Sequence, residues 1–316
     1  MARARQARAK RTVRENRVKV SWQDAIEEYL MVRKAEGLRP ATLKSQRQVL
    51  SLLYLRYPET WENPKAGVLK FLSEDIKPAT YNIRTAYLKT FFDWCRKQGY
   101  MTENPIEGFK KRKAGHRIVN IEPDVLQRLL QLPDRSTYVG RRDYGLILLQ
   151  LDTGIRPREA ARLLPDDVNL RSGEVYVRAE ASKTKVDRTL PISPATVKAI
   201  RELLAARPES WGPDVPVFAS QDGTELSRYS WLDRLQKYSR PLGVRLTPYS
   251  LRHVFALEFL RNGGHALALQ KMLGHADLTM TKRYVALTDG DMRQQHDMAS
   301  PLTKLLPNRK RGKRAR

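Results

Sequence analysis

Apolar residues recur at helical spacing through residues 21–110, with turn signals between the runs. The last run carries an aromatic stripe, which we interpret as packed core rather than as a surface for stacking bases. This block is therefore predicted to be wholly helical. The expected helices cover Trp22–Glu36, a run from Pro40 onward, Val68–Leu72, and a run from Pro78 to just before Gly99.

A second block, from Asn120 onward, mixes helical patterns with two short stretches of alternating apolar and polar residues. The alternating stretches, Gly173–Ala179 and Arg188–Ile192, are predicted to be antiparallel strands joined by a hairpin. The fold class is therefore mainly α, with a small antiparallel β-sheet in the second block. The expected helices are Pro123–Leu132, Tyr144–Leu151, a run from Pro157, Pro194–Ala206, Ser227–Ser239, a run from Pro248, and Ala266–Leu273.

Residues 104–118 are the best candidate for a linker, because they place Pro, two Gly and a basic run between helical blocks. We therefore expect a basic arm, a helical domain, a linker, a second domain and a C-terminal segment with a basic tail. Their predicted boundaries are 1–20, 21–110, 111–119, 120–295 and 296–316.

Charge is the strongest compositional signal. The 316 residues carry a formal net charge of +25, and 41% are hydrophobic, which is enough for real cores. Residues 1–20 and 304–316 contribute +7 each, which leaves +11 for the body between them. A basic excess of this size and spread is typical of a nucleic-acid-binding protein. We interpret both ends as flexible arms that contact phosphates.

Cys95 is the single cysteine, which excludes an internal disulfide and a cysteine-based zinc site. This usage fits a reducing compartment, and we expect a cytoplasmic protein associated with the nucleoid. The sequence contains no run of about 18 apolar residues, so no membrane span is expected. The first twenty residues are basic but lack the apolar segment of a secretory signal. No metal or other cofactor is predicted.

Two segments supply candidate anion-binding groups. Pro157 suits the first turn of a helix, so Arg156 lies at a helix N-terminus, where amide groups and the dipole favour an anion. Glu159, one turn on, can support the guanidinium, although a plain surface ion pair is the alternative. Farther along, Lys183 and Lys185 lie on the predicted hairpin tip, where a lysine is ordinarily just solvated.

Two further segments supply a second arginine, two histidines and two tyrosines. Tyr249 and Arg252 share a helix face, and we interpret His253 as a structural hydrogen-bonding residue rather than a catalyst. Gly274 suits the end of one helix, and Asp277 or Thr279 can cap the next. His275 therefore lies in a turn, nine positions before the helical Tyr284. On its own, the spacing of His275 and Tyr284 is weak evidence for a catalytic tyrosine, because a buried tyrosine is more often a packing residue.

Four separated pieces resemble the tyrosine recombinases in order and spacing, over roughly residues 20–290. This family includes phage and mobile-element integrases and the Xer-type and Cre-like enzymes. The resemblance implies a helical, SAM-like core-binding domain and a mixed, mainly helical catalytic domain that clamp duplex DNA. The pieces are Thr153-Gly154-Ile155-Arg156-Pro157-Arg158-Glu159, Ser182-Lys183-Thr184-Lys185 with the later Arg188-Thr189-Leu190-Pro191, Tyr249 with Arg252-His253, and Leu273-Gly274-His275 with Tyr284.

The resemblance implies a role for each matching residue. Tyr284 would be the nucleophile, forming a 3′-phosphotyrosyl link and freeing a 5′-hydroxyl without metal or ATP. A phenol of pKa near 10 needs local activation for this. Arg156 and Arg252 would grip the non-bridging phosphate oxygens with planar, charged donors.

The remaining matches are auxiliary groups. Lys183 would protonate the leaving 5′-oxygen, and Lys185 is the second choice because Lys183 has the better spacing to Pro191. His275 would donate to the phosphate, and Glu159 would support the first arginine.

One position departs from the family, which usually has His three residues before the second arginine, where this chain has Tyr249. A phenol can donate a hydrogen bond to the phosphate but is a poor general base. His275 or water would then act as the general base, or cleavage would be slower. Tyr249 is less favoured than Tyr284 as nucleophile, because it lies inside the Arg252 motif.

The sequence thus predicts a site-specific recombinase of a mobile element, acting as a tetramer on paired double-stranded DNA sites through a Holliday junction. The alternatives are a catalytically silent DNA-binding protein on the same scaffold and a type IB topoisomerase. Exposed basic positions could contact the DNA backbone or simply form a solvated face. They are Lys44, Arg47, Arg84, Lys89, Lys111, Arg112 and Lys113.

Overall fold

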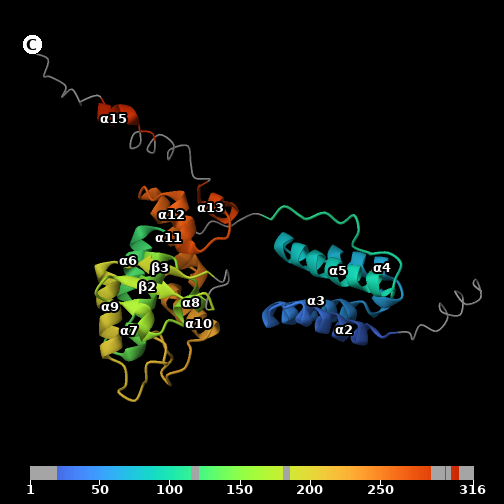
Figure 1. The fold of residues 1–316 in the computed structure, drawn as a ribbon, viewed down its shortest axis with the longest axis horizontal. Helices are drawn as coiled ribbons and strands as arrows, with labels where there is room; N and C mark the ends of the chain where they lie inside the picture. Colours follow the sequence, from blue (N-terminus) through green and yellow to red (C-terminus); the bar gives the residue numbers. More distant parts are fainter. Residues whose placement is uncertain (1–19, 115–120, 181–185, 286–295, 297–299, 306–316) are drawn as a thin grey trace, which may run out of the picture. The chain divides into compact units, whose positions relative to one another are not determined.

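The computed structural model describes residues 20–114, 121–180, 186–285, 296 and 300–305. The chain divides into two compact units, Met1–Gly115 and His116–Arg316 (Figure 1). The boundary lies inside the predicted linker 111–119, of which residues 115–119 are outside the described part. The predicted arm before residue 20 and most of the C-terminal segment also lie outside it. Among the described residues, no helix is both long and apolar enough to cross a bilayer.

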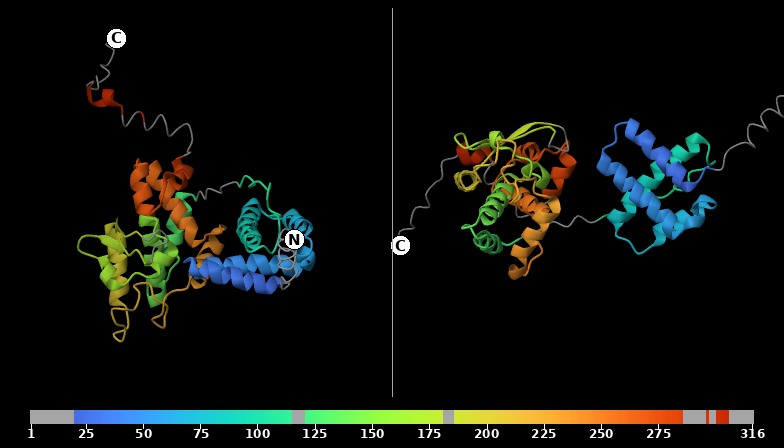
Figure 2. Two further views of the ribbon diagram at one scale, coloured as in Figure 1. Left: turned by 45° about the vertical axis from the view of Figure 1, so that its right-hand side comes forward. Right: turned by 90° about the horizontal axis from the view of Figure 1, so that it is seen from below.

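The N-terminal unit is helical, as predicted, and Figure 2 shows its blue and cyan helices packed against each other from two more directions. Each long helix begins where the sequence places a start signal. The Ser21 side chain accepts from the Asp24 amide, and the next three α-helices each carry a proline in the first turn. The elements are α2 (Trp22–Ala35), α3 (Pro40–Arg56), the 3-10 helix η1 (Pro58–Trp61), α4 (Pro64–Ser73) and α5 (Pro78–Gln98).

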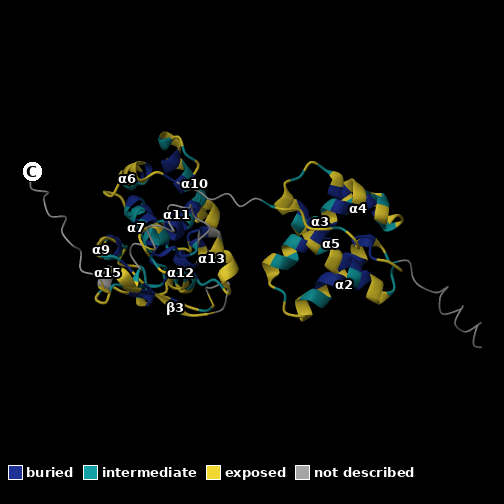
Figure 3. Ribbon diagram, turned by 90° about the horizontal axis from the view of Figure 1, so that it is seen from above, coloured by how far each residue is buried: buried dark blue, intermediate teal, exposed yellow. Residues whose placement is uncertain are grey.

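An aromatic cluster forms the core of this unit. The Trp22 ring stacks on Tyr54 and meets Phe91 edge to face, with ring centroids 5.6 and 5.3 Å away. Phe91, Phe92 and Trp94 of α5 are buried in contact with aromatic rings of α2, and the dark-blue inner faces of the helices in Figure 3 mark this core. The prediction that the aromatic stripe is core is confirmed for these rings, whereas Tyr87 is only half-buried.

The second unit packs helices around a small sheet. Its strands β1 (Val168–Asn169), β2 (Glu174–Val177) and β3 (Arg188–Pro191) are antiparallel in that order, with Val175 opposite both Val168 and Leu190. Its helical elements are α6 (Pro123–Gln131), α7 (Tyr138–Thr153), α8 (Pro157–Ala160), η2 (Pro165–Asp167), α9 (Pro194–Ala205), α10 (Arg228–Ser239), η3 (Arg240–Leu242), α11 (Pro248–Arg261), α12 (Ala266–Leu273), α13 (Leu278–Val285) and α15 (Pro301–Leu305).

Helix α7 lies at the centre of this unit, packed against both α9 and α11. It begins at Tyr138, six residues before the predicted start at Tyr144. The Thr137 side chain caps it by accepting from the Gly140 amide at 3.0 Å. The extra turns contain buried charged residues, which the apolar pattern could not reveal. At its other end, α7 leads directly into the candidate site.

Candidate active site

A glycine turn joins α7 to α8 and places Arg156. Gly154 ends α7 in the left-handed conformation, with φ of +62°. A Cβ at this glycine would lie 2.3 Å from Phe255 and 2.7 Å from Leu273, so no larger residue fits. Arg156 then stands at the N-cap of α8, as predicted. Because α8 has only four residues, side chains rather than a helix dipole dominate the local charge.

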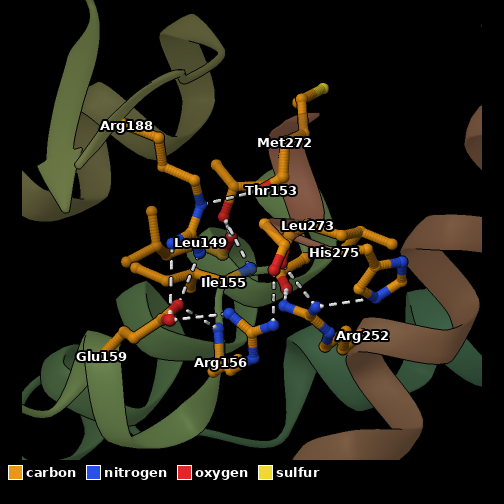
Figure 4. A network of polar contacts seen from close by, with 12 residues as sticks. Leu149, Thr153, Ile155, Arg156, Glu159, Arg188, Arg252, Met272, Leu273 and His275 are labelled. Atoms are coloured by element: carbon orange, nitrogen blue, oxygen red, sulfur yellow. Dashed lines mark hydrogen bonds and ion pairs between the residues drawn. The ribbon is translucent and has the colours of Figure 1, made fainter. Parts of the chain in front are cut away.

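Two guanidinium groups hold one carboxylate between them (Figure 4). Arg156 Nη1 lies 2.9 Å from Glu159 Oε1, and its Nη2 donates to the Gly274 carbonyl at 2.8 Å. Arg188, on β3, donates through Nη2 to Glu159 Oε2 at 2.5 Å and through Nε to the Met272 carbonyl at 2.9 Å. The carboxylate therefore ties α8 to β3, and the arginines tie both to the end of α12.

Arg252, on α11, is the third arginine at this place, and its side chain is buried. Its Nη1 donates to the Gly154 carbonyl at 2.6 Å, and its Nη2 donates to the Leu273 carbonyl at 2.7 Å. Burial, together with the nearby charge of Arg156, lowers the pKa of Arg252 to about 9. The group therefore remains a cation at neutral pH.

Charge at the site is unbalanced in favour of an anion. Burial alone would raise the pKa of Glu159, but its hydrogen bond with Arg188 and the charges of Arg188 and Arg156 outweigh burial and lower it. Glu159 is thus an anion at neutral pH. One carboxylate faces three guanidinium groups within this cluster, which leaves a surplus of positive charge for a phosphate.

The turn between α12 and α13 brings His275 to the arginines. Gly274 ends α12 with φ of +61°, and the Thr279 amide donates to the Asp277 side chain at 2.7 Å. Of the two predicted caps of α13, Asp277 is therefore the one used. His275 Nε2 lies 3.2 Å from Arg252 Nη2.

The contacts of His275 fix which ring nitrogen carries its proton. Because a guanidinium only donates, Nε2 accepts from Arg252. Nδ1 then carries the proton and donates to the hydroxyl of Thr281, 2.9 Å away. His275 thus contacts the arginine cluster through Nε2 and α13 through Nδ1, and its predicted contact with a phosphate stays a prediction.

Tyr284, on α13, is buried against an apolar cluster that includes Phe255 and Leu273. Its hydroxyl lies 2.6 Å from Nδ1 of His253 on α11. His253 therefore forms a hydrogen bond, and its partner is the candidate nucleophile itself. Arg252 and His253 are consecutive, so one turn of α11 reaches both the arginine cluster and Tyr284.

Tyr249 lies in the first turn of α11, and its side chain is 54% exposed. Within the described residues its hydroxyl has no hydrogen-bond partner. The Thr247 side chain caps the helix by accepting from the Ser250 amide at 3.1 Å, as predicted. The Tyr249 ring is therefore accessible from solvent.

Sequence reasoning placed Arg188 in a motif segment but gave it no role, and it missed Thr281. Strand β3 carried a signal for the first, because alternation puts Arg188 on the same face as the buried Leu190. Thr281 had no such signal, since its role depends on the turn that brings His275 over α13. Lys183 and Lys185 lie outside the described residues.

The backbone candidates of the first unit differ in what they contact. The prediction that Arg84 is exposed is wrong, because its guanidinium is buried over the Phe71 ring and bonds Glu74 at 2.7 Å. Arg112 is exposed but stacks on Tyr81, with its guanidinium carbon 3.9 Å from the ring centroid. Arg47 is exposed and paired with Glu27. The remaining candidates are all exposed, and they are Lys44, Lys89, Lys111 and Lys113.

A buried tyrosine beside a guanidinium cluster on a mixed, mainly helical unit defines an enzyme site suited to attack on a phosphodiester. Residues 120–290 match the sequence profile described as the phage integrase family. The tyrosine recombinase XerC of Serratia marcescens is 30% identical over 294 residues, which cover 89% of this chain and 95% of the relative. The chain therefore belongs to the phage integrase family of tyrosine recombinases, as its motifs indicated.

Other relatives and solved structures agree. XerC of Salmonella typhi is 29% identical over 279 residues, covering 84% of this chain and 92% of the relative. The Tn1549 transposon integrase in complex with a circular intermediate DNA has a TM-score of 0.69 at 19% identity, covering 88% of this chain and 99% of that one. A lambda integrase dimer bound to a COC′ core site has a TM-score of 0.66 at 20% identity, covering 84% of this chain and 77% of that one. The predicted fold class is confirmed.

Proposed function

We propose that this protein is a site-specific DNA recombinase that cuts and rejoins duplex DNA through a 3′-phosphotyrosyl intermediate. One observation carries the proposal. Arg252 and His253, adjacent on α11, contact the phosphate-side His275 at 3.2 Å and the Tyr284 hydroxyl at 2.6 Å. A phosphate held by Arg252 would therefore lie within reach of the tyrosine that attacks it.

In this proposal the Tyr284 oxygen attacks the scissile phosphorus, and the bond from phosphorus to the 5′-oxygen breaks. Arg156 and Arg252 neutralise the charge on the non-bridging oxygens, and His275 donates to the same phosphate once its Nε2 carries a proton and no longer accepts from Arg252. Following the family pattern, Lys183 supplies the proton for the leaving 5′-oxygen. The phosphotyrosyl bond retains the energy of the phosphodiester, so rejoining needs no ATP.

The proposed partner is double-stranded DNA, and the active form is a homo-tetramer on paired sites. A lambda integrase tetramer bound to a Holliday junction shares the fold, with a TM-score of 0.64. The net charge of +25 supports a large phosphate contact area, so binding should weaken steeply as salt rises. A transposon integrase is among the structures of the same fold, which supports a mobile element as the source of the sites. We expect the protein to act in the cytoplasm, on the nucleoid.

A covalent-trapping experiment tests this function. The binding site is first selected from a random duplex library, and a nicked suicide duplex is built on it so that cleavage cannot be reversed. The wild-type protein should form a covalent adduct with the 3′ side of the cut, and Tyr284→Phe should form none. An adduct with Tyr284→Phe would remove the nucleophile assignment.

Two other outcomes correspond to the alternative functions. Specific binding without any adduct would support a catalytically silent DNA-binding protein, which the replacement of the usual histidine by Tyr249 favours. Relaxation of supercoiled plasmids that lack the selected site would support a type IB topoisomerase.

A further inference from the structure

The contact between His253 and Tyr284 has no counterpart in the motif roles described above. Nδ1 of His253 lies 2.6 Å from the Tyr284 hydroxyl, across the packing of α11 against α13. The two residues are 31 positions apart in sequence, so this is a tertiary contact and not a consequence of helix spacing. A neutral imidazole with an unprotonated Nδ1 accepts from the phenol in this geometry.

The other candidates for a base are placed elsewhere. Nε2 of His275 faces Arg252, and its Nδ1 faces Thr281 at 2.9 Å. Tyr249 stands where the family usually has a histidine, but its side chain is mostly exposed and a phenol is a poor base. His253 follows Tyr249 by four residues, which is about one helical turn on α11.

We propose that His253 is the general base for Tyr284, one turn along α11 from the position where the family carries a histidine. This inference rests on the proposed function. As the bond from Oη to phosphorus forms, the phenol proton moves to Nδ1 of His253 and the bond from phosphorus to the 5′-oxygen breaks. The 5′-oxygen takes a proton from the leaving-group acid, which the family pattern assigns to Lys183.

Rejoining runs the same transfer backwards. The 5′-hydroxyl gives its proton back to the leaving-group acid as it attacks phosphorus, the bond from phosphorus to Oη breaks, and the His253 imidazolium returns its proton to Oη. His253 is therefore a catalytic residue in both half-reactions, because its ring nitrogen touches the reacting oxygen.

Two substitutions separate proton transfer from packing. In His253→Asn the amide oxygen can take the place of Nδ1 and accept the phenol hydrogen bond, but it cannot take the proton. His253→Ala removes the ring and leaves space for an added imidazole. Both variants are measured in single-turnover cleavage of the nicked suicide duplex, with thermal melting and DNA binding as controls for folding.

We expect both variants to cleave about a hundredfold or more slowly than wild type, in the range typical of general-base catalysis. Added imidazole should restore part of the rate in His253→Ala but not in His253→Asn, where the ring position is filled. A merely structural role would not respond to imidazole.

A second substrate distinguishes the two proton-transfer steps. In a duplex with a 5′-bridging phosphorothiolate at the scissile position, the leaving thiolate needs no acid. This substrate should rescue Lys183→Ala and leave the His253 variants slow.

Each failure has a distinct signature. If the wild type forms no adduct, the proposed function itself fails. If the wild type forms one and Tyr284→Phe does not, but His253→Asn cleaves within threefold of wild type, only the role of His253 is wrong. Rescue of the His253 variants by the phosphorothiolate would also overturn the proposal, because it would show that His253 acts as the acid for the leaving group.

Discussion

Arg188 reaches from β3 to Glu159 in α8, and its Nη2 lies 2.5 Å from the carboxylate oxygen. The same carboxylate holds Arg156 at 2.9 Å, while its own side chain is only 1% exposed. A buried carboxylate is costly unless charged donors surround it, and this one has a guanidinium on each side. Arg188 therefore helps to hold Arg156 in place, because it binds the same carboxylate.

Glu159→Gln should destabilise the second unit by about 3 kcal/mol at pH 7, because it leaves two guanidinium groups without a counter-charge. The pKa of Glu159 lies below its usual 4.5. The ionised carboxylate therefore contributes its full share to the free energy of unfolding above pH 4.5. This stabilisation is lost as the pH falls through the lowered pKa. Urea unfolding at pH 7 and near pH 4 measures this, and the difference between the proteins should shrink at the lower pH.

Glu225→Gln is the matched control, because Glu225 forms an ion pair with Arg162 in the same unit but both side chains are substantially exposed. It should change stability by no more than about 0.5 kcal/mol at either pH. A loss for Glu159→Gln that stays constant between the two pH values would contradict the ionised, doubly paired carboxylate.

Arg188→Lys should slow cleavage about tenfold and leave DNA affinity within threefold of wild type. A lysine keeps the charge but cannot hold the Glu159 carboxylate and the Met272 carbonyl at once. Single-turnover rates on the suicide duplex measure the first effect, and binding in a Tyr284→Phe background measures the second. Arg201→Lys, at an exposed position of α9, is the control and should behave as wild type.

The helices and the four motif segments were predictable because they depend on local signals. Proline starts, glycine stops and the caps at Ser21 and Thr247 are read directly from neighbouring residues. Strand β1 was not predictable, because two residues carry no alternation. The exposure of Arg84 was misjudged for a related reason: its cation lies over Phe71, a contact that helix spacing does not reveal.

The site shows the same limit. Arg156, Arg252, His275 and Tyr284 were found because their spacing resembles that of the tyrosine recombinases. The partner of His253 was not found, because the contact depends on how α13 packs on α11. Sequence therefore identified the chemical groups, and packing determined which of them meet.

Arg156→Gln and Arg252→Gln should each slow cleavage by about 10²–10³-fold, because in the proposed mechanism each removes charged donors that bind the phosphate. DNA affinity, measured in a Tyr284→Phe background, should fall by less than threefold, since one phosphate among many is affected. The exposed Arg128 provides a control, and Arg128→Gln should cleave normally. Equal losses of binding and cleavage would show that the two arginines are only anchors.

Asp143→Ala should destabilise the second unit by about 3–5 kcal/mol, because it removes the carboxylate from a buried charged network. Arg142 and Arg234 each bond this carboxylate at 2.7 Å, and the Tyr238 hydroxyl donates to it at 2.8 Å. Urea unfolding measures the loss. Asp233→Ala, at an exposed position of α10, is the control and should be nearly neutral.

Tyr249→Phe should still form the covalent adduct, and its cleavage rate should fall only about five- to tenfold. The loss corresponds to one hydrogen bond from the exposed hydroxyl to the phosphate, worth about 1 kcal/mol. Single-turnover trapping measures both the adduct and the rate. Loss of the adduct would identify Tyr249, not Tyr284, as the nucleophile, since the exposed ring makes a folding defect an unconvincing explanation.

Tyr249→His extends this prediction, because it puts an imidazole where the family usually has one. In the His253→Asn protein, Tyr249→His should raise the cleavage rate by about tenfold or more. The new imidazole can act as the general base from a position one turn away from residue 253 on α11. Made in the wild type, the same substitution should change the rate less, since His253 already accepts the proton. An equal gain in both backgrounds would show that position 249 acts on the phosphate rather than on the Tyr284 proton.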